Sequence, residues 1–194
     1  MKSLTTARGN PYVTMVWLAI LGSCMLFLFL ILLFFARTHL PGAEKIFVPT
    51  AFAFSTASIV LSSLSLELCR TALRKEEYRT AFYRLSLTLL LGISFALLQY
   101  AGLQRYLQLN LPLSNHGLAF AWIFCGLHFL HILAGSTALL WVWNAFRKNL
   151  RYVDAYVLQL NPMVNTVFRT GVIFWHFLGI LWILLFLVLW LNQP

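Results

Sequence analysis

Five long apolar segments constrain the fold of this chain more than any other feature. They cover approximately residues 13–36, 47–69, 85–104, 117–146 and 168–191. A helix of roughly 20 mainly apolar residues crosses the hydrocarbon layer of a bilayer, and such runs satisfy their backbone groups in lipid only as helices. We therefore predict an all-α, polytopic membrane protein, a bundle of five transmembrane helices in a single transmembrane domain of residues 1–194.

The basic residues predict an orientation for these spans. If the N-terminus is cytoplasmic, 11 of the 14 lysines and arginines lie inside, and only Arg37, Lys45 and Arg105 lie outside. The positive-inside rule therefore predicts an N-in/C-out topology. The net charge of +9 is explained by this topology and by contact with anionic lipid, so we expect no nucleic-acid partner.

The loops and cysteines give weaker signals. The longest loop, "RKNLRYVDAYVLQLNPMVN", lies on the cytoplasmic side, and no loop is large enough to form a soluble catalytic domain. An enzyme that works alone is therefore disfavoured.

Cys24, Cys69 and Cys125 form no CxxC pair and are interpreted as small buried residues. The apolar run continues after "LGSC", which indicates a retained first span rather than a lipoprotein signal.

The second span carries a stripe of small residues spaced alternately by four and three positions: Ala51, Ser55, Ser58, Ser62, Ser65 and Cys69. This spacing places them on one face of a helix. Small residues let helix backbones approach closely in lipid. A hydrophilic pathway along the serines is the alternative, but a serine row without carboxylates favours packing.

Two histidines, His128 and His131, lie in the apolar stretch "FCGLHFLHILAGST" of the fourth span. They share a face with small residues, so they should point toward protein. Haem or metal ligation, proton transfer and helix packing are the possible roles. Counting 1.5 Å per residue from the basic ends places His176 about 14 Å from their depth, too far for a second axial haem ligand.

Gln99 and Ser55 fall at nearly the same depth as His131 when counted in the same way. We predict a structural polar cluster of Ser55, Gln99, His128 and His131. In it, Gln99 bonds one of the neutral histidines directly or through one water. Glu67, three residues from Arg70, is expected to pair locally with that arginine.

Several stretches resemble subunit III of the haem-copper oxidases, the cytochrome c oxidase type. They occur in the family's order and cover nearly the whole chain: "VWLAILGSCMLFLFLILLF", "VPTAFAFSTASIVLSSLSLEL", "LTLLLGISFALLQY", "CGLHFLHILAGST" and "FWHFLGILWILLFLVLW". The two histidine motifs are the more specific. Three family carboxylates are missing: Cys24 follows Ser23, Gly179 replaces an aspartate, and no glutamate follows Gln99.

The resemblance implies an accessory, non-catalytic subunit in a five-helix short form. Such a subunit stabilises catalytic subunit I beside the other oxidase subunits, while the complex reduces oxygen to water. This chain is then expected to bind no redox cofactor, with haem and copper in the catalytic partner. The resemblance also implies a bound phospholipid and support of proton uptake, and the missing carboxylates put the proton role in doubt.

A phospholipid is expected at the inner ends of the helices. Residues that are predicted to contact it are Arg70, Arg74, Arg147, Lys148, Trp175 and His176. Unspecific headgroup contact is the alternative.

We expect a multi-pass protein of the bacterial inner (plasma) membrane. Rival readings are an accessory subunit of a quinol oxidase or nitric oxide reductase, a haem-b quinone-reactive anchor, and a small transporter, which the shortage of buried charge disfavours.

Overall fold

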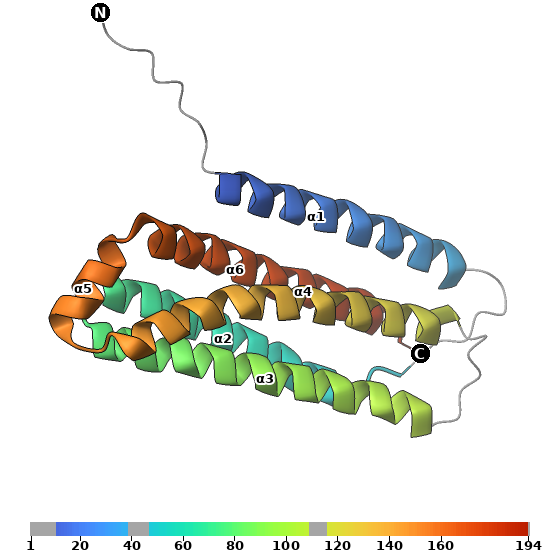
Figure 1. Cartoon of the computed structure of the whole chain (residues 1–194). Helices are drawn as coiled ribbons and strands as arrows, with labels where there is room; N and C mark the ends of the chain where they lie inside the picture. The colour runs from blue at the N-terminus through green and yellow to red at the C-terminus, as the bar shows by residue number, and fades with distance from the viewer. Residues whose placement is uncertain (1–10, 39–46, 109–115, 194) are drawn as a thin grey trace, which may run out of the picture.

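The computed structural model describes residues 11–38, 47–108 and 116–193, and it is helical throughout these ranges apart from short connections (Figure 1). Its elements are α1 Pro11–Thr38, α2 Thr50–Arg74, α3 Tyr78–Gln108, α4 His116–Lys148, α5 Tyr152–Leu160 and α6 Pro162–Leu191. All but α5 are long and apolar enough to cross a membrane. The prediction of an all-α, five-span membrane protein is confirmed.

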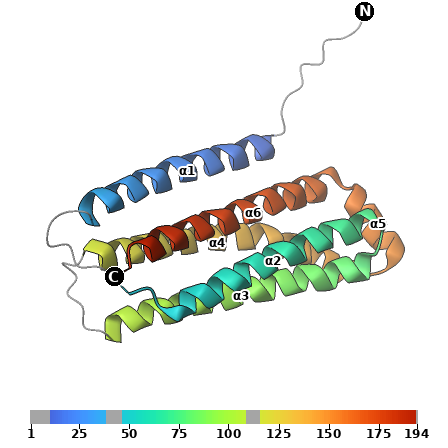
Figure 2. The same cartoon turned by 180° about the vertical axis from the view of Figure 1, so that it is seen from behind.

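The helices form three layers (Figures 1 and 2). Helix α1 lies on one side, α2 and α3 lie together on the other, and α4 and α6 lie between them. Helices α2 and α4 end, and α3 and α6 begin, at the same end of the bundle, which we call the basic end. The lysines and arginines that the structure describes there are Arg70, Arg74, Lys75, Arg79, Arg84, Arg147, Lys148, Arg151 and Arg169.

Helix α5 was not predicted, since its sequence was interpreted as part of a loop. It has nine residues, crosses the basic end, and buries only Ala155 among its own side chains. A helix this short and this exposed does not resemble a membrane span. Asn161 then starts α6, because its side chain accepts a hydrogen bond from the Met163 N–H at 2.9 Å and Pro162 occupies the first helical position.

Helices α2 and α3 are joined by the tight turn Lys75–Glu77 and pack closely along the predicted small-residue stripe. Three serines of α2 donate hydrogen bonds to backbone carbonyls of α3: Ser58 to Leu91 at 2.9 Å, Ser62 to Thr88 at 3.0 Å, and Ser65 to Arg84 at 2.9 Å. A side chain this short reaches a carbonyl of the neighbouring helix only when the two backbones are close. The packing interpretation of the stripe is confirmed.

Helix α1 attaches to α4 and α6 through a narrow stripe. Its buried residues are Ser23, Phe27, Ile31 and Phe34, and none of them precedes position 23. Cys24 lies on the outward face and is exposed, whereas Cys69 and Cys125 are buried. The expectation of a buried cysteine is therefore wrong for Cys24, because α1 turns only one face toward protein.

Candidate functional site

The predicted polar layer exists in part, between α2 and α3. The Gln99 Nε2 donates to the Ser55 Oγ at 3.1 Å, and the Ser55 hydroxyl donates to the Phe52 carbonyl at 2.8 Å. Both side chains are buried. The shared depth of Gln99 and Ser55 therefore corresponds to a real contact between their helices.

His128 belongs to the core but not to this hydrogen-bonded pair. Its side chain is 1% exposed and packs against the rings of Phe95 and Trp182, with centroid distances of 5.6 and 5.5 Å. Within the described residues, neither of its ring nitrogens has a hydrogen-bond partner, and neither does the Gln99 Oε1. A direct bond between Gln99 and His128 is therefore wrong, and the bridge through one water stays a prediction.

His131 reaches α1 instead of α3. Its Nδ1 lies 2.6 Å from the Leu127 carbonyl, which can only accept, so Nδ1 carries the proton. Its Nε2 lies 2.9 Å from the Ser23 Oγ. The direct bond from Gln99 to His131 is also wrong, because the two side chains point toward different helices. Sequence reasoning missed Ser23 as the partner, although it is the one polar residue in the buried stripe of α1.

The predicted lipid contact of Trp175 is wrong. Its side chain is 0% exposed, and its indole N–H donates to the Ser62 Oγ at 3.1 Å. The ring fills a slot between α3 and α4: a Cβ at Gly92 would lie 2.9 Å from it, and a Cβ at Gly135 would lie 3.4 Å away. Trp175 thus joins four helices, and no face of it is left for lipid.

A second α6 tryptophan repeats this arrangement seven residues later. The Trp182 indole N–H donates to the Thr56 Oγ1 at 3.0 Å, and the ring packs edge-on against Phe52 and Phe95. Both tryptophans therefore attach α6 to hydroxyls of α2. Gly179, where the resemblance would lead one to expect an aspartate, lies on the same contact, since a Cβ there would be 3.1 Å from the Ser63 Oγ.

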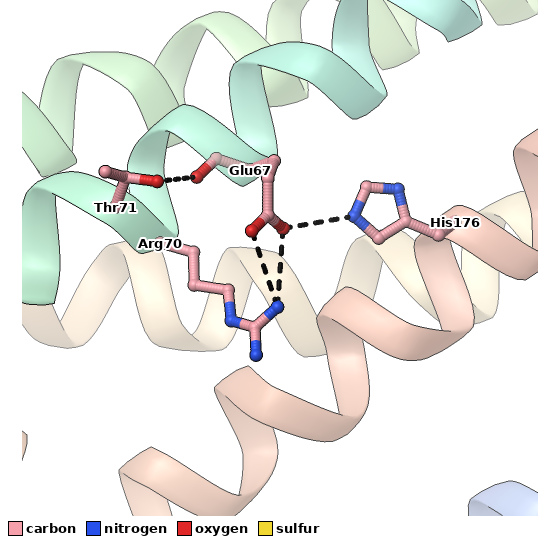
Figure 3. Close-up of polar contacts among 4 residues, drawn as sticks. All are labelled: Glu67, Arg70, Thr71 and His176. Atoms are coloured by element: carbon pink, nitrogen blue, oxygen red, sulfur yellow. Dashed lines mark hydrogen bonds and ion pairs between the residues drawn. The ribbon is translucent and has the colours of Figure 1, made fainter.

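A charged cluster lies at the basic end, where α2 approaches α6 (Figure 3). The Arg70 Nη1 is 3.4 Å from the Glu67 Oε1, and the His176 Nε2 is 3.7 Å from the Glu67 Oε2. The predicted local pairing of Glu67 and Arg70 is confirmed. His176 joins it from α6, so it lies beside a carboxylate as well as near the predicted lipid cations.

A pocket of about 420 Å³ opens beside this cluster. Its lining residues are Arg70, Leu73, Arg74, Phe146, Gln159, Val164, Asn165, Phe168, Arg169, Val172 and Ile173. Two of the predicted lipid cations, Arg70 and Arg74, line it, but Arg147 and Lys148 do not. The Arg147 guanidinium lies 5.3 Å from the centroid of the Trp143 ring, and Lys148 is exposed. Sequence reasoning missed Arg169, which α6 brings to the same pocket.

Helix α5 closes one side of the basic end through two polar contacts. The Gln159 Nε2 donates to the Leu73 carbonyl at the end of α2 at 3.3 Å. The Tyr152 hydroxyl donates to the Glu76 carboxylate, and this bond raises the pKa of Tyr152 to about 12. Both ends of α5 are therefore tied to the turn region between α2 and α3.

Two groups of known proteins are similar to this chain. A family model described as "Cytochrome c oxidase subunit III" matches residues 13–193. Cytochrome bo(3) ubiquinol oxidase subunit 3 of Buchnera aphidicola subsp. Schizaphis graminum is 26% identical, over 96% of either chain. The corresponding Pseudomonas aeruginosa protein is 26% identical over 90% of this chain and 82% of its own.

Cytochrome c oxidase subunit 3 of Bacillus sp. strain PS3 is 23% identical over 96% of this chain and 88% of its own. The family match includes all five apolar helices, the histidine stretch of α4 and both buried tryptophans of α6. The chain belongs to the cytochrome c oxidase subunit III family.

Proposed function

We propose that this chain is the accessory, non-catalytic subunit III of a respiratory haem-copper terminal oxidase in the bacterial inner membrane. It stabilises the catalytic subunit while the complex reduces oxygen to water. The observation that carries this proposal is the family match over residues 13–193. The core supports it, because the half-buried His131 and the buried Gln99 and Trp175 connect helices to one another.

The electron donor is the open part of this proposal, and quinol is the second candidate beside cytochrome c. Relatives named as ubiquinol oxidase subunits match over 82–96% of their own length. The cytochrome c oxidase subunit of Loxodonta africana matches over only 47% of its own length. The Bacillus relative, also named as a cytochrome c oxidase subunit, matches over 88%, so overall length does not separate the two donors.

We infer the orientation from the charge of the basic end. Among the described residues, nine lysines and arginines lie there, and the positive-inside rule favours the cytoplasm for such an end. The same charges attract anionic lipid of the cytoplasmic leaflet. We therefore include phospholipid binding at the basic end in the proposed function, with Arg70 and Arg74 in the pocket and Arg147, Lys148 and His176 on the neighbouring surface.

Co-purification tests the proposal directly. The tagged chain would be purified from native membranes in mild detergent, and its partners identified by mass spectrometry. We expect a haem-copper catalytic subunit to accompany it, with a haem spectrum that belongs to that partner. Oxygen uptake with quinol and with reduced cytochrome c then identifies the donor. Purification without any oxidase subunit, or haem bound by the chain alone, would overturn the proposal.

Cysteine labelling tests the orientation separately. The three native cysteines would first be replaced, and single cysteines would then be placed at Lys75 or at Arg105. Lys75 follows α2 at the basic end, and Arg105 lies in the last turn of α3 at the opposite end of the bundle. A membrane-impermeant reagent added outside the cell should label position 105 and leave position 75 unlabelled until the cells are opened. The reverse result would invert the topology.

A further inference from the structure

Helix α5 buries one face against the bundle and leaves the opposite face apolar and uncovered. Ala155, at the centre of the inner face, is 0% exposed. Val153, Val157 and Leu160 are 69%, 61% and 63% exposed. These three recur at steps of four and three residues, so they form one stripe on the side of the helix away from Ala155. We call them the α5 stripe.

The inner face of α5 lies against the ends of its neighbours. The Gln159 amide bonds the Leu73 carbonyl at the end of α2, and the Tyr152 ring packs against the Tyr78 ring at the start of α3, with a centroid distance of 5.4 Å. Helix α5 also contacts α4 and α6. Figure 1 shows it lying across the basic end of the bundle. The α5 stripe therefore points away from the bundle.

This direction leads out of the membrane. Helix α4 has 33 residues and is about 50 Å long, whereas a bilayer with its headgroups is about 40–45 Å thick. Helix α5 begins after a connection of only three residues, so it lies at or outside the headgroups with its stripe toward water. Lipid tails do not reach such a stripe. An apolar patch that faces water marks a surface that another protein covers.

Residues around the α5 stripe enlarge it into a patch. Leu150 and Met163 flank α5 in the sequence, Tyr156 adjoins the stripe, and all three are exposed. Aromatic residues, methionine and arginine are enriched at interfaces between proteins. The composition of this patch therefore favours a polypeptide as its partner.

A hollow of about 560 Å³ adjoins the start of α5. It is lined by Glu76, Glu77, Tyr78, Arg79, Thr80, Leu150, Arg151 and Tyr152. Carboxylates and guanidinium groups thus occur together in it. An anionic membrane surface attracts a uniformly basic surface, whereas a hollow with both charges suits the mixed polar side chains at the rim of a protein interface.

The charge beside the α5 stripe indicates the chemistry of the partner. Lys148 and Arg151 are exposed and precede α5, whereas Asp154 is the one acidic residue of α5. Opposite charges across an interface steer the encounter and fix the register of the two surfaces. A segment with apolar residues on one face and acidic residues next to them complements this surface.

We propose that the α5 stripe and the adjoining hollow form a docking surface for a cytoplasmic segment of another oxidase subunit. Apolar residues of that segment pack against Val153, Val157 and Leu160, and an acidic residue lies beside Arg151. The inference rests on the proposed function for the identity of the partner and for the side of the membrane. It adds a contact outside the lipid layer to the role of an accessory subunit.

Site-specific photo-crosslinking in native membranes tests the proposal. The photo-reactive residue p-benzoylphenylalanine would replace Val157 in the full-length tagged chain, and the cross-linked peptides would be identified by mass spectrometry. Leu107 is the control position, because it is exposed in the last turn of α3 at the opposite end of the bundle. In a second series the photo-reactive residue replaces Val153, and Val157→Asp, Arg151→Glu or Leu107→Asp is added.

We expect position 157 to cross-link to an acidic cytoplasmic segment of an oxidase subunit, and position 107 not to reach that segment. Val157→Asp should lower the yield from position 153 about tenfold, because it places a carboxylate in an apolar contact. Arg151→Glu should lower the yield too, since like charges then face each other. Leu107→Asp should leave it unchanged. The side chains of Val157 and Leu107 are both exposed, so neither aspartate disturbs the core.

Several results would overturn the docking surface. These are cross-links from position 157 to lipid, to a second copy of this chain or to a protein outside the oxidase, the absence of any cross-link, and equal effects of Val157→Asp and Leu107→Asp. Co-purification separates this failure from that of the proposed function. If oxidase subunits accompany the chain but position 157 cross-links to none of them, the docking surface alone is wrong. If no oxidase subunit accompanies the chain, the proposed function is wrong, and the partner named for α5 is wrong with it.

Discussion

Helices α1 and α2 show how differently two spans of one bundle are held. The most apolar window of α1 has a mean hydropathy of 2.9, yet only 22% of it is buried. The window of α2 has a mean hydropathy of 1.5, and 44% of it is buried. Lipid solvates apolar side chains as well as protein does, so apolar surface alone does not drive spans together. Small and hydroxyl residues do so in α2.

Helix α6 shows that low hydropathy is not the only route to burial. Its window has a mean hydropathy of 2.6, near that of α1, and 50% of it is buried. The difference lies in Trp175 and Trp182, whose rings fill slots between helices while their N–H groups bond α2 hydroxyls. Burial in this bundle therefore follows interlocking shape and hydrogen bonding, and single substitutions separate these two factors.

The largest effect is expected at Gly102, where α3 meets α2. A Cβ at this position would lie 2.3 Å from the Phe52 Cε1, and Phe52 is 0% exposed, so its ring has little room to move. We expect Gly102→Ala to reduce the free energy of unfolding by about 3 kcal/mol or more. Denaturation by sodium dodecyl sulfate in mixed micelles, followed by circular dichroism, measures it.

Gly22→Ala is the matched control on α1. Nothing lies within 4 Å of a Cβ built at Gly22, so the added methyl group meets no protein atom. We expect the free energy of unfolding to change by less than about 0.5 kcal/mol. Equal effects of the two substitutions would mean that α2 and α3 are no more closely packed than α1 is.

A smaller loss is expected when the Trp175 indole is removed. Trp175→Phe deletes the N–H that bonds Ser62 and leaves part of the slot empty. The lost bond and the cavity together should cost about 2 kcal/mol of unfolding free energy. Trp190→Phe is the control, since Trp190 is 54% exposed on the same helix. If Trp175→Phe changed lipid retention but not stability, the structural role of Trp175 would be wrong.

The sequence predicted most of the fold because the bilayer imposes a single, simple requirement. Apolar length identified all five spans, and the spacing of small residues identified the buried face of α2. Helix α5 was not predicted, because a nine-residue helix outside the membrane does not need a long apolar sequence. The Asn161–Pro162 pair did mark the start of α6, but the surrounding stretch was interpreted only as a loop.

The candidate site was predicted less well, because depth is readable from sequence and direction is not. Counting residues placed Gln99, Ser55 and His131 in one layer. It could not tell that Gln99 faces α2 while His131 faces α1. Trp175 was assigned to lipid from its place near basic residues. The slot for its ring is formed by Gly92 of α3 and Gly135 of α4, and no sequence pattern within α6 indicates that these glycines face Trp175.

An intermediate effect is expected for a single serine of the α2–α3 contact. Ser58→Ala removes one hydrogen bond to the Leu91 carbonyl and little volume. Such interhelical bonds contribute about 0.6 kcal/mol on average in membrane proteins, and we expect a loss of that size. Thr137→Ala is the control, because the Thr137 hydroxyl is exposed and bonds its own helix at Ala134. If Ser58→Ala kept the full unfolding free energy, the contact between α2 and α3 would be held by the fit of their side chains alone.

The smallest effect is expected at the contact between α1 and α4. Ser23→Ala removes the hydroxyl 2.9 Å from the His131 Nε2, but the imidazole keeps its bond to the Leu127 carbonyl and its contact with the Phe27 ring. We expect a loss of about 0.5 kcal/mol or less. Cys24→Ala, at the neighbouring exposed position, should cause none.

A double-mutant cycle isolates this bond. His131→Ala alone should cost more than Ser23→Ala, because it also removes the ring packed on Phe27, with no change in the haem spectrum of the complex. The two substitutions together should cost less than the sum of the single losses, by the coupling energy of the bond. Additive losses would show that Ser23 and His131 are neighbours without an energetic link. The attachment of α1 would then depend on the packing of Phe27, Ile31 and Phe34. Shape would hold α1 in place, as it holds α2 and α3 together at Gly102.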